Sequence, residues 1–129
     1  LLIGCDINSS QQALHLAQQY HLLATAGVHP HDAKSADEKL EIQLCALAAN
    51  PEIVAIGECG LDYNRDFSPR ETQRSVLHRQ LALAVELNLP VYLHERDASE
   101  DMLAILQQYS VRGVLHCFTG DQHAVEQYL

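Results

Sequence analysis

The sequence predicts an α/β protein built on a parallel sheet. Short apolar runs alternate along the chain with segments of helical pattern, and each run is continuously apolar, as expected of strands buried on both faces. The predicted strands are Leu1–Ile3, Leu22–Val28, Ile53–Gly57, Val91–Leu93 and Val114–Leu115. This order of about five β-α units favours parallel strands joined by right-handed crossovers. Two architectures stay open, a doubly wound open sheet and part of a (β/α)₈ TIM-type barrel.

The helical segments carry start and stop signals. Ser68 followed by Pro69 and Glu71 has the spacing of a capping box, with proline at the first helical position. Pro51 and Pro90 are expected to end the helices that precede them. Four more residues begin the capping-box spacing: Ser9, Ser35, Asp97 and Thr119. No glycine-rich phosphate loop follows the first run, which weakens the interpretation as a nucleotide-binding sheet.

Size and charge limit the classes of protein that fit. The 129 residues are enough for one domain, residues 1–129, and the 47% hydrophobic content allows a real core. No apolar run reaches the roughly 18 residues of a membrane-spanning helix. The net charge of −9 argues against broad, sequence-independent binding to phosphate backbones. It does not exclude nucleic acid as a substrate, because a metal ion can supply positive charge locally.

The cysteines and the two chain ends suggest a cytoplasmic fragment. The four cysteines have irregular spacing and no C-x-x-C pair, so we expect them to be reduced and buried. No basic-then-apolar leader precedes the first run, and nothing points to secretion. The chain begins at Leu1 inside an apolar run and stops at Leu129 inside a helical pattern. We therefore expect a piece of a longer cytoplasmic protein.

Polar residues follow four of the predicted strands. The residues at these positions are His29 and His31, Glu58, His94, and His116. Each histidine alone would more often be a packing residue, and Glu58 alone an ordinary loop residue. In a barrel, however, these positions lie on one rim, where barrel active sites are built. The joint pattern therefore predicts a metal site made by Glu58, His94 and His116.

At these positions the sequence resembles the TatD-type deoxyribonucleases, a family within the amidohydrolase-like metal barrels. Four stretches carry the resemblance, in the order in which the family has them: Ala26–His31, Ile56–Tyr63, Leu93–Ala98 and Leu115–Gly120. The similarity covers essentially all 129 residues. It implies a (β/α)₈ barrel that holds one or two divalent metal ions, Mg²⁺, Mn²⁺ or Zn²⁺.

The resemblance also implies roles for single residues. Glu58 is similar to the family's bridging carboxylate and is the expected catalytic residue, with His94 and His116 as histidine ligands. His29, His31 and Arg96 are expected to bind the substrate phosphate, Arg96 through its planar guanidinium. Asp62 is expected to support the ligands by hydrogen bonding.

Two parts of the family pattern have no counterpart in the chain. The family's first strand often carries a pair of histidine ligands, and its last strand carries the aspartate of a T-D-x-P-type motif. The chain thus resembles strands two to six, with strands one, seven and eight missing. We expect the chain alone to be inactive, because the missing aspartate is a metal ligand and the general base.

The predicted function is metal-assisted hydrolysis of phosphodiester bonds in DNA, as by a deoxyribonuclease or exonuclease. Two alternatives stay open. One is a related metal barrel that hydrolyses a small ester, lactone or amide, and the other is a catalytically inactive metal-binding scaffold. We expect the full-length protein to be a monomer that does not associate with membranes.

Overall fold

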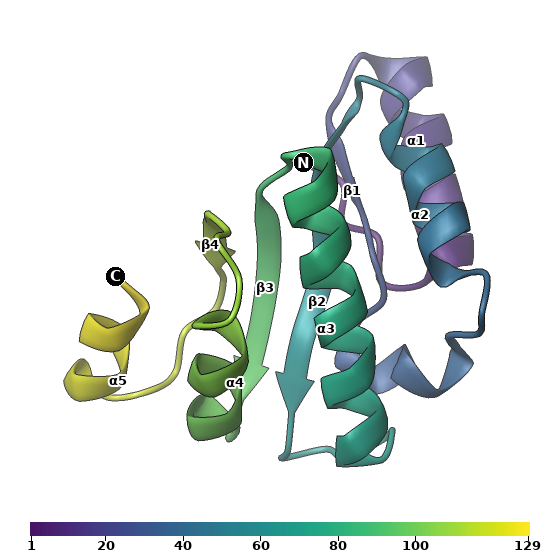
Figure 1. Cartoon of the computed structure of the whole chain (residues 1–129). Coiled ribbons are helices and arrows are strands. Elements are labelled where there is room, and N and C mark those ends of the chain that lie inside the picture. Colours follow the sequence, from purple (N-terminus) through teal and green to yellow (C-terminus); the bar gives the residue numbers. More distant parts are fainter.

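A parallel sheet forms the centre of the computed structural model, which describes residues 1–129 (Figure 1). Its strands are β1 (Ala24–Ala26), β2 (Ile53–Asp62), β3 (Val91–Arg96) and β4 (Gly113–Leu115). They lie side by side in the order β1-β2-β3-β4, and every neighbouring pair is parallel. The predicted α/β class with a parallel sheet is confirmed.

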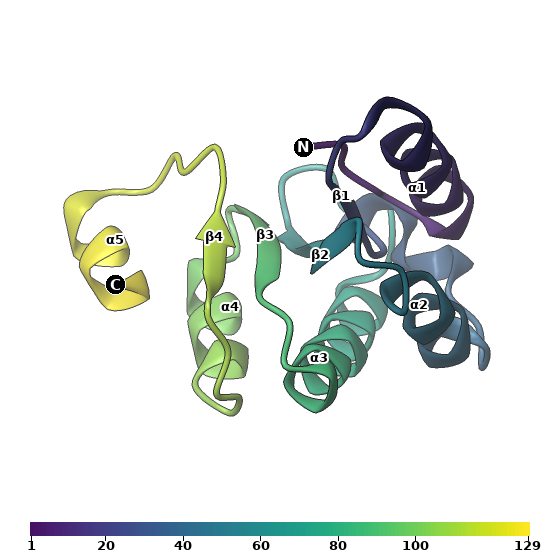
Figure 2. The same ribbon diagram turned by 90° about the horizontal axis from the view of Figure 1, so that it is seen from above.

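The helices lie on the convex side of the curved sheet (Figure 2). In chain order they are α1 (Ile7–Tyr20), the 3₁₀ helix η1 (Pro30–Ser35), α2 (Leu40–Ala48), α3 (Arg70–Leu87), α4 (Ser99–Leu106) and α5 (Gln122–Tyr128). A helix therefore separates each strand from the next, as right-handed crossovers require. None of these helices is both long and apolar enough to cross a membrane.

The prediction of a fifth strand at Leu1–Ile3 was wrong. Leu2 makes only an isolated parallel bridge with Ala24. Its N–H donates to the Leu23 carbonyl and its carbonyl accepts from the Thr25 N–H, both at 2.9 Å. The segment stays this short because Asp6 already caps α1, where it exchanges hydrogen bonds with Ser9 in a capping box. Ser9 is thus the fourth residue of that box, at position N3, and not its cap.

Strand β2 continues well past the predicted end at Gly57. The pairing with β3 shifts at Glu58, because Gly57 lies opposite Tyr92 and Cys59 opposite Leu93. Glu58 is the extra residue of this β-bulge, and its N–H donates to the Gly4 carbonyl at 2.8 Å. Beyond the bulge, Gly60 has φ +151°, and a Cβ there would lie 1.7 Å from the His94 carbonyl oxygen. Glycine thus allows the close approach of β2 to β3.

Helix α3 fixes the backbone of two segments that carry polar side chains. The buried Gln80 side chain accepts from the Val28 N–H at 2.8 Å and donates to the Val28 carbonyl at 2.9 Å. Gln73, also buried, does the same for Asp62, at 2.9 and 3.1 Å. Each glutamine side chain thus makes the two hydrogen bonds that a neighbouring strand would make. These bonds satisfy backbone groups that would otherwise be buried without partners.

Ser68 does not cap α3 as the sequence pattern predicted. The helix begins at Arg70 after Pro69, with no side-chain cap. The Ser68 hydroxyl instead donates to the His31 carbonyl and accepts from the Lys34 N–H, both at 3.0 Å. Because Ser68 is fully buried, it ties the loop after β2 to η1.

The core lies between the sheet and helices α1 to α4 and includes 23 buried residues. It thins out towards the carboxyl end of the chain, where β4 and α5 have no buried residue. All four cysteines are free. The expectation that they are buried was only partly right, because Cys45 and Cys117 are exposed on the surface and Cys59 alone is fully enclosed.

Candidate metal centre

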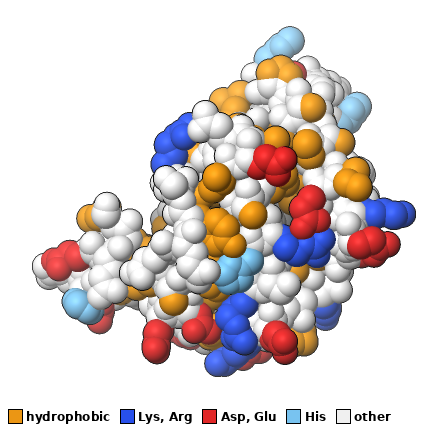
Figure 3. All heavy atoms as spheres, in the orientation of Figure 1, with side chains coloured by type: hydrophobic (Ala, Val, Ile, Leu, Met, Phe, Trp, Pro, Cys, Tyr) orange, Lys and Arg blue, Asp and Glu red, His pale blue; other side chains and the backbone are white.

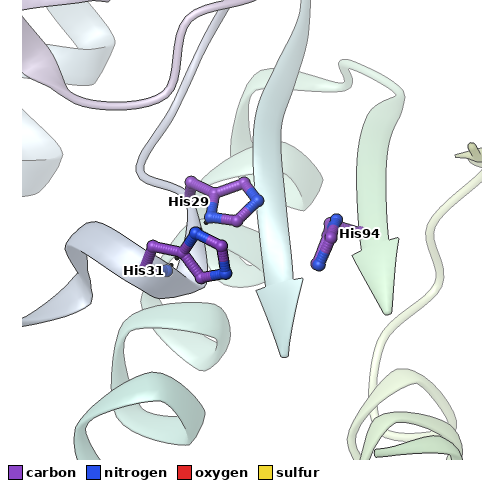
Figure 4. A group of neighbouring side chains, drawn as sticks. All are labelled: His29, His31 and His94. Atoms are coloured by element: carbon purple, nitrogen blue, oxygen red, sulfur yellow. Dashed lines mark hydrogen bonds between the residues drawn. The ribbon is translucent and has the colours of Figure 1, made fainter. Parts of the chain in front are cut away.

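The carboxyl half of the sheet brings the predicted polar residues together. Glu58 and Asp62 come from β2, His94 from β3, and His116 directly follows β4. His29 and His31 flank Pro30 at the start of η1, and their rings lie across β2 from His94 (Figure 4). The ring centroid of His94 lies 4.5 Å from that of His29 and 5.9 Å from that of His116. The six side chains thus form one cluster.

Glu58 lies at the centre of this cluster with 8% of its surface exposed. Its Oε1 is 2.5 Å from His116 Nε2, 3.2 Å from His94 Nδ1 and 3.5 Å from His29 Nε2. Burial acts to raise the pKa of Glu58, but hydrogen bonds from the three histidines outweigh it and hold the pKa well below the usual range of a carboxyl group. The carboxylate is therefore ionised at neutral pH.

Asp62 connects the histidines to the loop that follows β2. Its Oδ2 accepts from His31 Nε2 at 2.8 Å and from His94 Nε2 at 3.1 Å. Its Oδ1 accepts from the N–H groups of Asn64 and Arg65, at 3.0 and 2.8 Å. Burial acts to raise the pKa of Asp62, yet these hydrogen bonds lower it to about 2.

His94 stands between the two carboxylates. Burial acts to lower its pKa, but Glu58 and Asp62 outweigh burial and raise the pKa above the ordinary value for imidazole. Because a carboxylate only accepts hydrogen bonds, the nitrogen facing Asp62 carries a proton. In neutral His94, the other nitrogen, Nδ1, then presents a lone pair to Glu58 Oε1. Two such atoms 3.2 Å apart need a proton or a cation between them.

Two sets of side chains are close enough to hold a metal ion, with ligand atoms within 4.8 Å of one another. The first set is His29, His31 and His94, and the second is Glu58, His94 and His116. In the first set His29 Nδ1 accepts from the His31 N–H at 3.0 Å. Neutral His29 therefore carries its proton on Nε2 and has no free lone pair for a metal.

The second set fits a divalent cation better. It offers one ionised carboxylate and two imidazoles, a donor set that suits zinc and manganese. His94 also shows the arrangement common in metal sites, in which one ring nitrogen binds a carboxylate and the other remains for the metal. The chemistry of the donors thus favours Glu58, His94 and His116.

Arg96 lies apart from the cluster. Its side chain is exposed and makes no ion pair or hydrogen bond within the chain. It lines an open pocket of about 350 Å³ together with His94, Glu95, Asp97, Cys117 and Thr119. The pocket adjoins the cluster through His94, so Arg96 borders the candidate centre without contacting its carboxylates.

Sequence reasoning missed two aromatic neighbours of the cluster. Tyr92 stacks on His116, with ring centroids 5.0 Å apart and planes 21° apart. Its position two residues before His94 was the available signal, since alternate residues of a strand share a face. Phe67 lies perpendicular to His31, with centroids 4.9 Å apart. Phe67 is in an irregular loop, where no periodic pattern marks its place.

The fold and the site define a class. A curved parallel α/β sheet with a carboxylate and several imidazoles at the carboxyl ends of its strands is typical of the metal-binding (β/α)-barrel proteins. The family model described as TatD related DNase matches residues 1–129. The chain belongs to this family, and the resemblance inferred from the sequence motifs is confirmed.

The relatives of the chain are about twice its length. It is 48% identical to the 3'-5' ssDNA/RNA exonuclease TatD of Salmonella typhimurium over 98% of its own length and 50% of that protein. It is 45% identical to the protein of the same name from Escherichia coli K12, with the same coverage. The chain thus spans about half the length of the curated relatives it matches.

Solved structures resemble the chain in the same way. The TatD homologue YJJV from Escherichia coli K12 superposes with a TM-score of 0.90 and 31% identity, over 98% of this chain and 51% of that one. A TatD family hydrolase from Entamoeba histolytica gives a TM-score of 0.86 and 29% identity, over 97% of this chain and 46% of that one. The four-stranded α/β unit therefore matches half of each of these TatD family chains.

Proposed function

We propose that the full-length protein is a metal-dependent phosphodiesterase that acts as a 3'-5' exonuclease on single-stranded DNA or RNA. The names of the relatives suggest the substrate and the direction. The observation that carries the proposal is the buried Glu58 carboxylate, which faces three imidazoles at the carboxyl ends of the strands. Such a group is costly to bury unless a cation or protons compensate its charge.

In this proposal Glu58, His94 and His116 hold a divalent ion. A bound divalent cation supplies Lewis-acid charge to a phosphodiester and lowers the pKa of water. Glu58 contributes the negative charge that attracts the cation, and Asp62 keeps the proton of His94 on Nε2 so that Nδ1 remains available. Cleavage assays with Mg²⁺, Mn²⁺ and Zn²⁺ added in turn identify the ion that supports activity.

The remaining site residues bind the substrate in this proposal. His29 presents an N–H towards Glu58, and His31 lies beside it at the edge of the cluster. His29 is placed to donate its Nε2–H to a phosphate bound at the metal ion, and His31, whose Nε2 binds Asp62, lines the phosphate site beside it. Arg96 is unpaired and exposed in the adjoining pocket, and its guanidinium can contact a second phosphate of the strand.

We also propose that residues 1–129 form part of one (β/α)₈ barrel domain. The 51% coverage of a TatD family chain and the curvature of the sheet support this architecture. The further ligands then come from the strands outside this chain, and closing the barrel covers the open edges of the sheet. The cytoplasmic location and the monomeric state stay predictions.

The test is cleavage of a 5'-labelled single-stranded oligonucleotide by the full-length protein, with Mg²⁺, Mn²⁺ or Zn²⁺ added in turn and with chelator. We expect shortening from the 3' end only with metal, loss of it in His116→Ala, and no change in the control His123→Ala. His123 is an exposed histidine on α5. Full activity in chelator would refute the proposal. Metal-dependent cleavage of a small ester such as p-nitrophenyl acetate, without cleavage of the oligonucleotide, would favour the small-molecule alternative.

A further inference from the structure

Phe67 is a large apolar side chain that the fold leaves in solvent beside the candidate metal centre. Its side chain is 54% exposed. Of the ten exposed large hydrophobic residues, only two are aromatic, Tyr20 and Phe67. Tyr20 is the last residue of α1, before the amino end of β1, whereas Phe67 follows the carboxyl end of β2. Of these two aromatic residues, Phe67 is thus the one near the carboxyl ends of the strands, where the cluster lies.

The exposure of Phe67 does not come from a loose loop. On one side of it, Asp62 Oδ1 binds the N–H groups of Asn64 and Arg65, at 3.0 and 2.8 Å. On the other side, the buried Ser68 hydroxyl links to the His31 carbonyl at 3.0 Å. The backbone is therefore anchored before and after Phe67 while the ring itself projects outward. A loop held in this way loses little further backbone entropy when a ligand packs on the ring.

The ring contacts the cluster edge to face. Its plane makes an angle of 79° with that of His31, at a centroid distance of 4.9 Å. In such a perpendicular contact, at least one face of the phenyl ring is free of the imidazole. His31 in turn shares Asp62 with His94, so the ring is linked by direct contacts to a proposed metal ligand. A planar group on Phe67 would lie next to a phosphate bound at the centre.

Apart from Arg96, which is proposed to contact a phosphate, the charge of the chain does not favour binding of a nucleic-acid strand. The chain has a net charge of −9. Figure 3, in the orientation of Figure 1, shows the face that the helices cover, where acidic and basic side chains are interspersed. Single-stranded nucleic acids expose the faces of their bases, and aromatic side chains bind these faces with little sequence preference.

We propose that Phe67 is a stacking platform for a base of the single-stranded substrate, next to the phosphate that is cleaved. This inference rests on the proposed function, because it assumes a nucleic-acid strand at the metal centre. It assigns to a residue outside the ligand set the task of holding the strand in place. It also accounts for a preference for unpaired strands, since the bases of a duplex already stack on one another.

The experiment compares Phe67→Ala, Phe67→Leu and Phe67→Trp in the full-length protein, with Tyr20→Ala as the matched control. The substrates are a single-stranded oligodeoxynucleotide and copies with one abasic residue at each of the last few positions. Loss of one stacked base should raise KM about tenfold in Phe67→Ala, while kcat stays unchanged. Phe67→Leu should behave like Phe67→Ala, and Phe67→Trp and Tyr20→Ala like the wild type. On one of the abasic substrates, the wild type and Phe67→Ala should become equal.

A binding measurement separates this inference from the proposed function. An oligonucleotide with 2-aminopurine near its 3' end should lose fluorescence on binding to the wild type in chelator, and less so with Phe67→Ala. If the wild type cleaves no oligonucleotide but quenches the probe more than Phe67→Ala does, the proposed exonuclease is wrong while Phe67 still stacks on a base. If Phe67→Ala matches the wild type in both KM and quenching, the inference is overturned. The inference would also be overturned if Phe67→Ala raised KM relative to the wild type by the same factor on the intact substrate and on every abasic substrate.

Discussion

Strands β2 and β4 both deliver a residue to the cluster, but they differ in how the protein holds them. Nine of the ten residues of β2 are buried, and it pairs with a strand on each side. Strand β4 has three residues, none of them buried, and pairs only with β3. Glu58 and Asp62 are therefore fixed by their backbone, whereas within residues 1–129 His116 follows a strand at the edge of the sheet.

The difference shows two ways to position a side chain. On β2 the bulge at Glu58 and the Gln73 contact with Asp62 fix the backbone, and the side chains follow. At the end of β4 the ring of His116 is held by its own contacts, the stack on Tyr92 and the hydrogen bond to Glu58. Substitutions that affect β2 and substitutions near the end of β4 should therefore have different effects on stability and on metal binding.

The largest effect should come from Glu58→Gln, because Glu58 lies on β2 and also binds His116 after β4. Glutamine keeps the shape but removes the negative charge that faces the three imidazoles. The metal content of the purified full-length protein should fall to background, as measured by atomic emission. The control Glu126→Gln changes an exposed glutamate on α5 and should keep the wild-type content. Equal metal content in both variants would remove Glu58 from the site.

The second largest effect should distinguish β2 from the region of β4 by the free energy of unfolding. Gln73→Leu leaves the N–H and the carbonyl of Asp62 in β2 buried without a partner, at a cost of about 1–3 kcal/mol for each group. Urea unfolding should therefore show a loss of about 4 kcal/mol, the middle of the combined range of about 2–6 kcal/mol. Gln108→Leu removes an exposed glutamine near β4 and should change the free energy of unfolding by less than about 0.5 kcal/mol. Similar losses in both variants would contradict the contrast between the regions.

The same contrast explains what the sequence could predict. The cluster was predictable because the carboxyl ends of parallel strands share one edge, so His29, Glu58, His94 and His116 had to lie near one another. The bulge and the end of β2 were not, because Gly57 and Gly60 look like strand terminators but here allow close pairing.

Contacts between distant side chains and the backbone were also beyond prediction. The hydrogen bonds of Gln80 span 52 positions in the chain and leave no periodic pattern. Ser68 had the expected pattern of a helix cap, but a more distant partner, the His31 carbonyl, took its hydroxyl. Local propensity gave way to tertiary contacts at both positions.

A smaller effect should come from Asp62→Asn, which tests how β2 holds His94. The amide keeps one acceptor but loses the charge that holds the proton on His94 Nε2. Loss of such a partner weakens metal binding by about 10- to 100-fold, and chelator competition on the full-length protein should show this. Asp66→Asn, an exposed aspartate in the same loop, is the control. A metal affinity equal to that of the wild type would mean that Asp62 serves only the loop.

The smallest effect should come from Tyr92→Leu, which tests how the stack on Tyr92 positions His116 at the end of β4. An aromatic pair contributes about 0.5–1.5 kcal/mol beyond burial, so kcat/KM on the oligonucleotide should fall about fivefold. Tyr92→Phe keeps the stack on His116 and should stay close to the wild type. If Tyr92→Phe loses as much as Tyr92→Leu, the hydroxyl group matters and the stack does not.

The hydrogen bonds of the Asp62 carboxylate restrict the length of the side chain at this position as well as its charge. One oxygen binds two loop amides and the other binds two imidazoles, so the carboxylate works as a spacer between the loop and the histidines. Glutamate carries the same charge one methylene further from the backbone, and its oxygens cannot reach both pairs of donors from β2. A substitution that looks conservative by charge would therefore separate the Phe67 loop from His94. At this position the length of the side chain therefore matters as much as its charge.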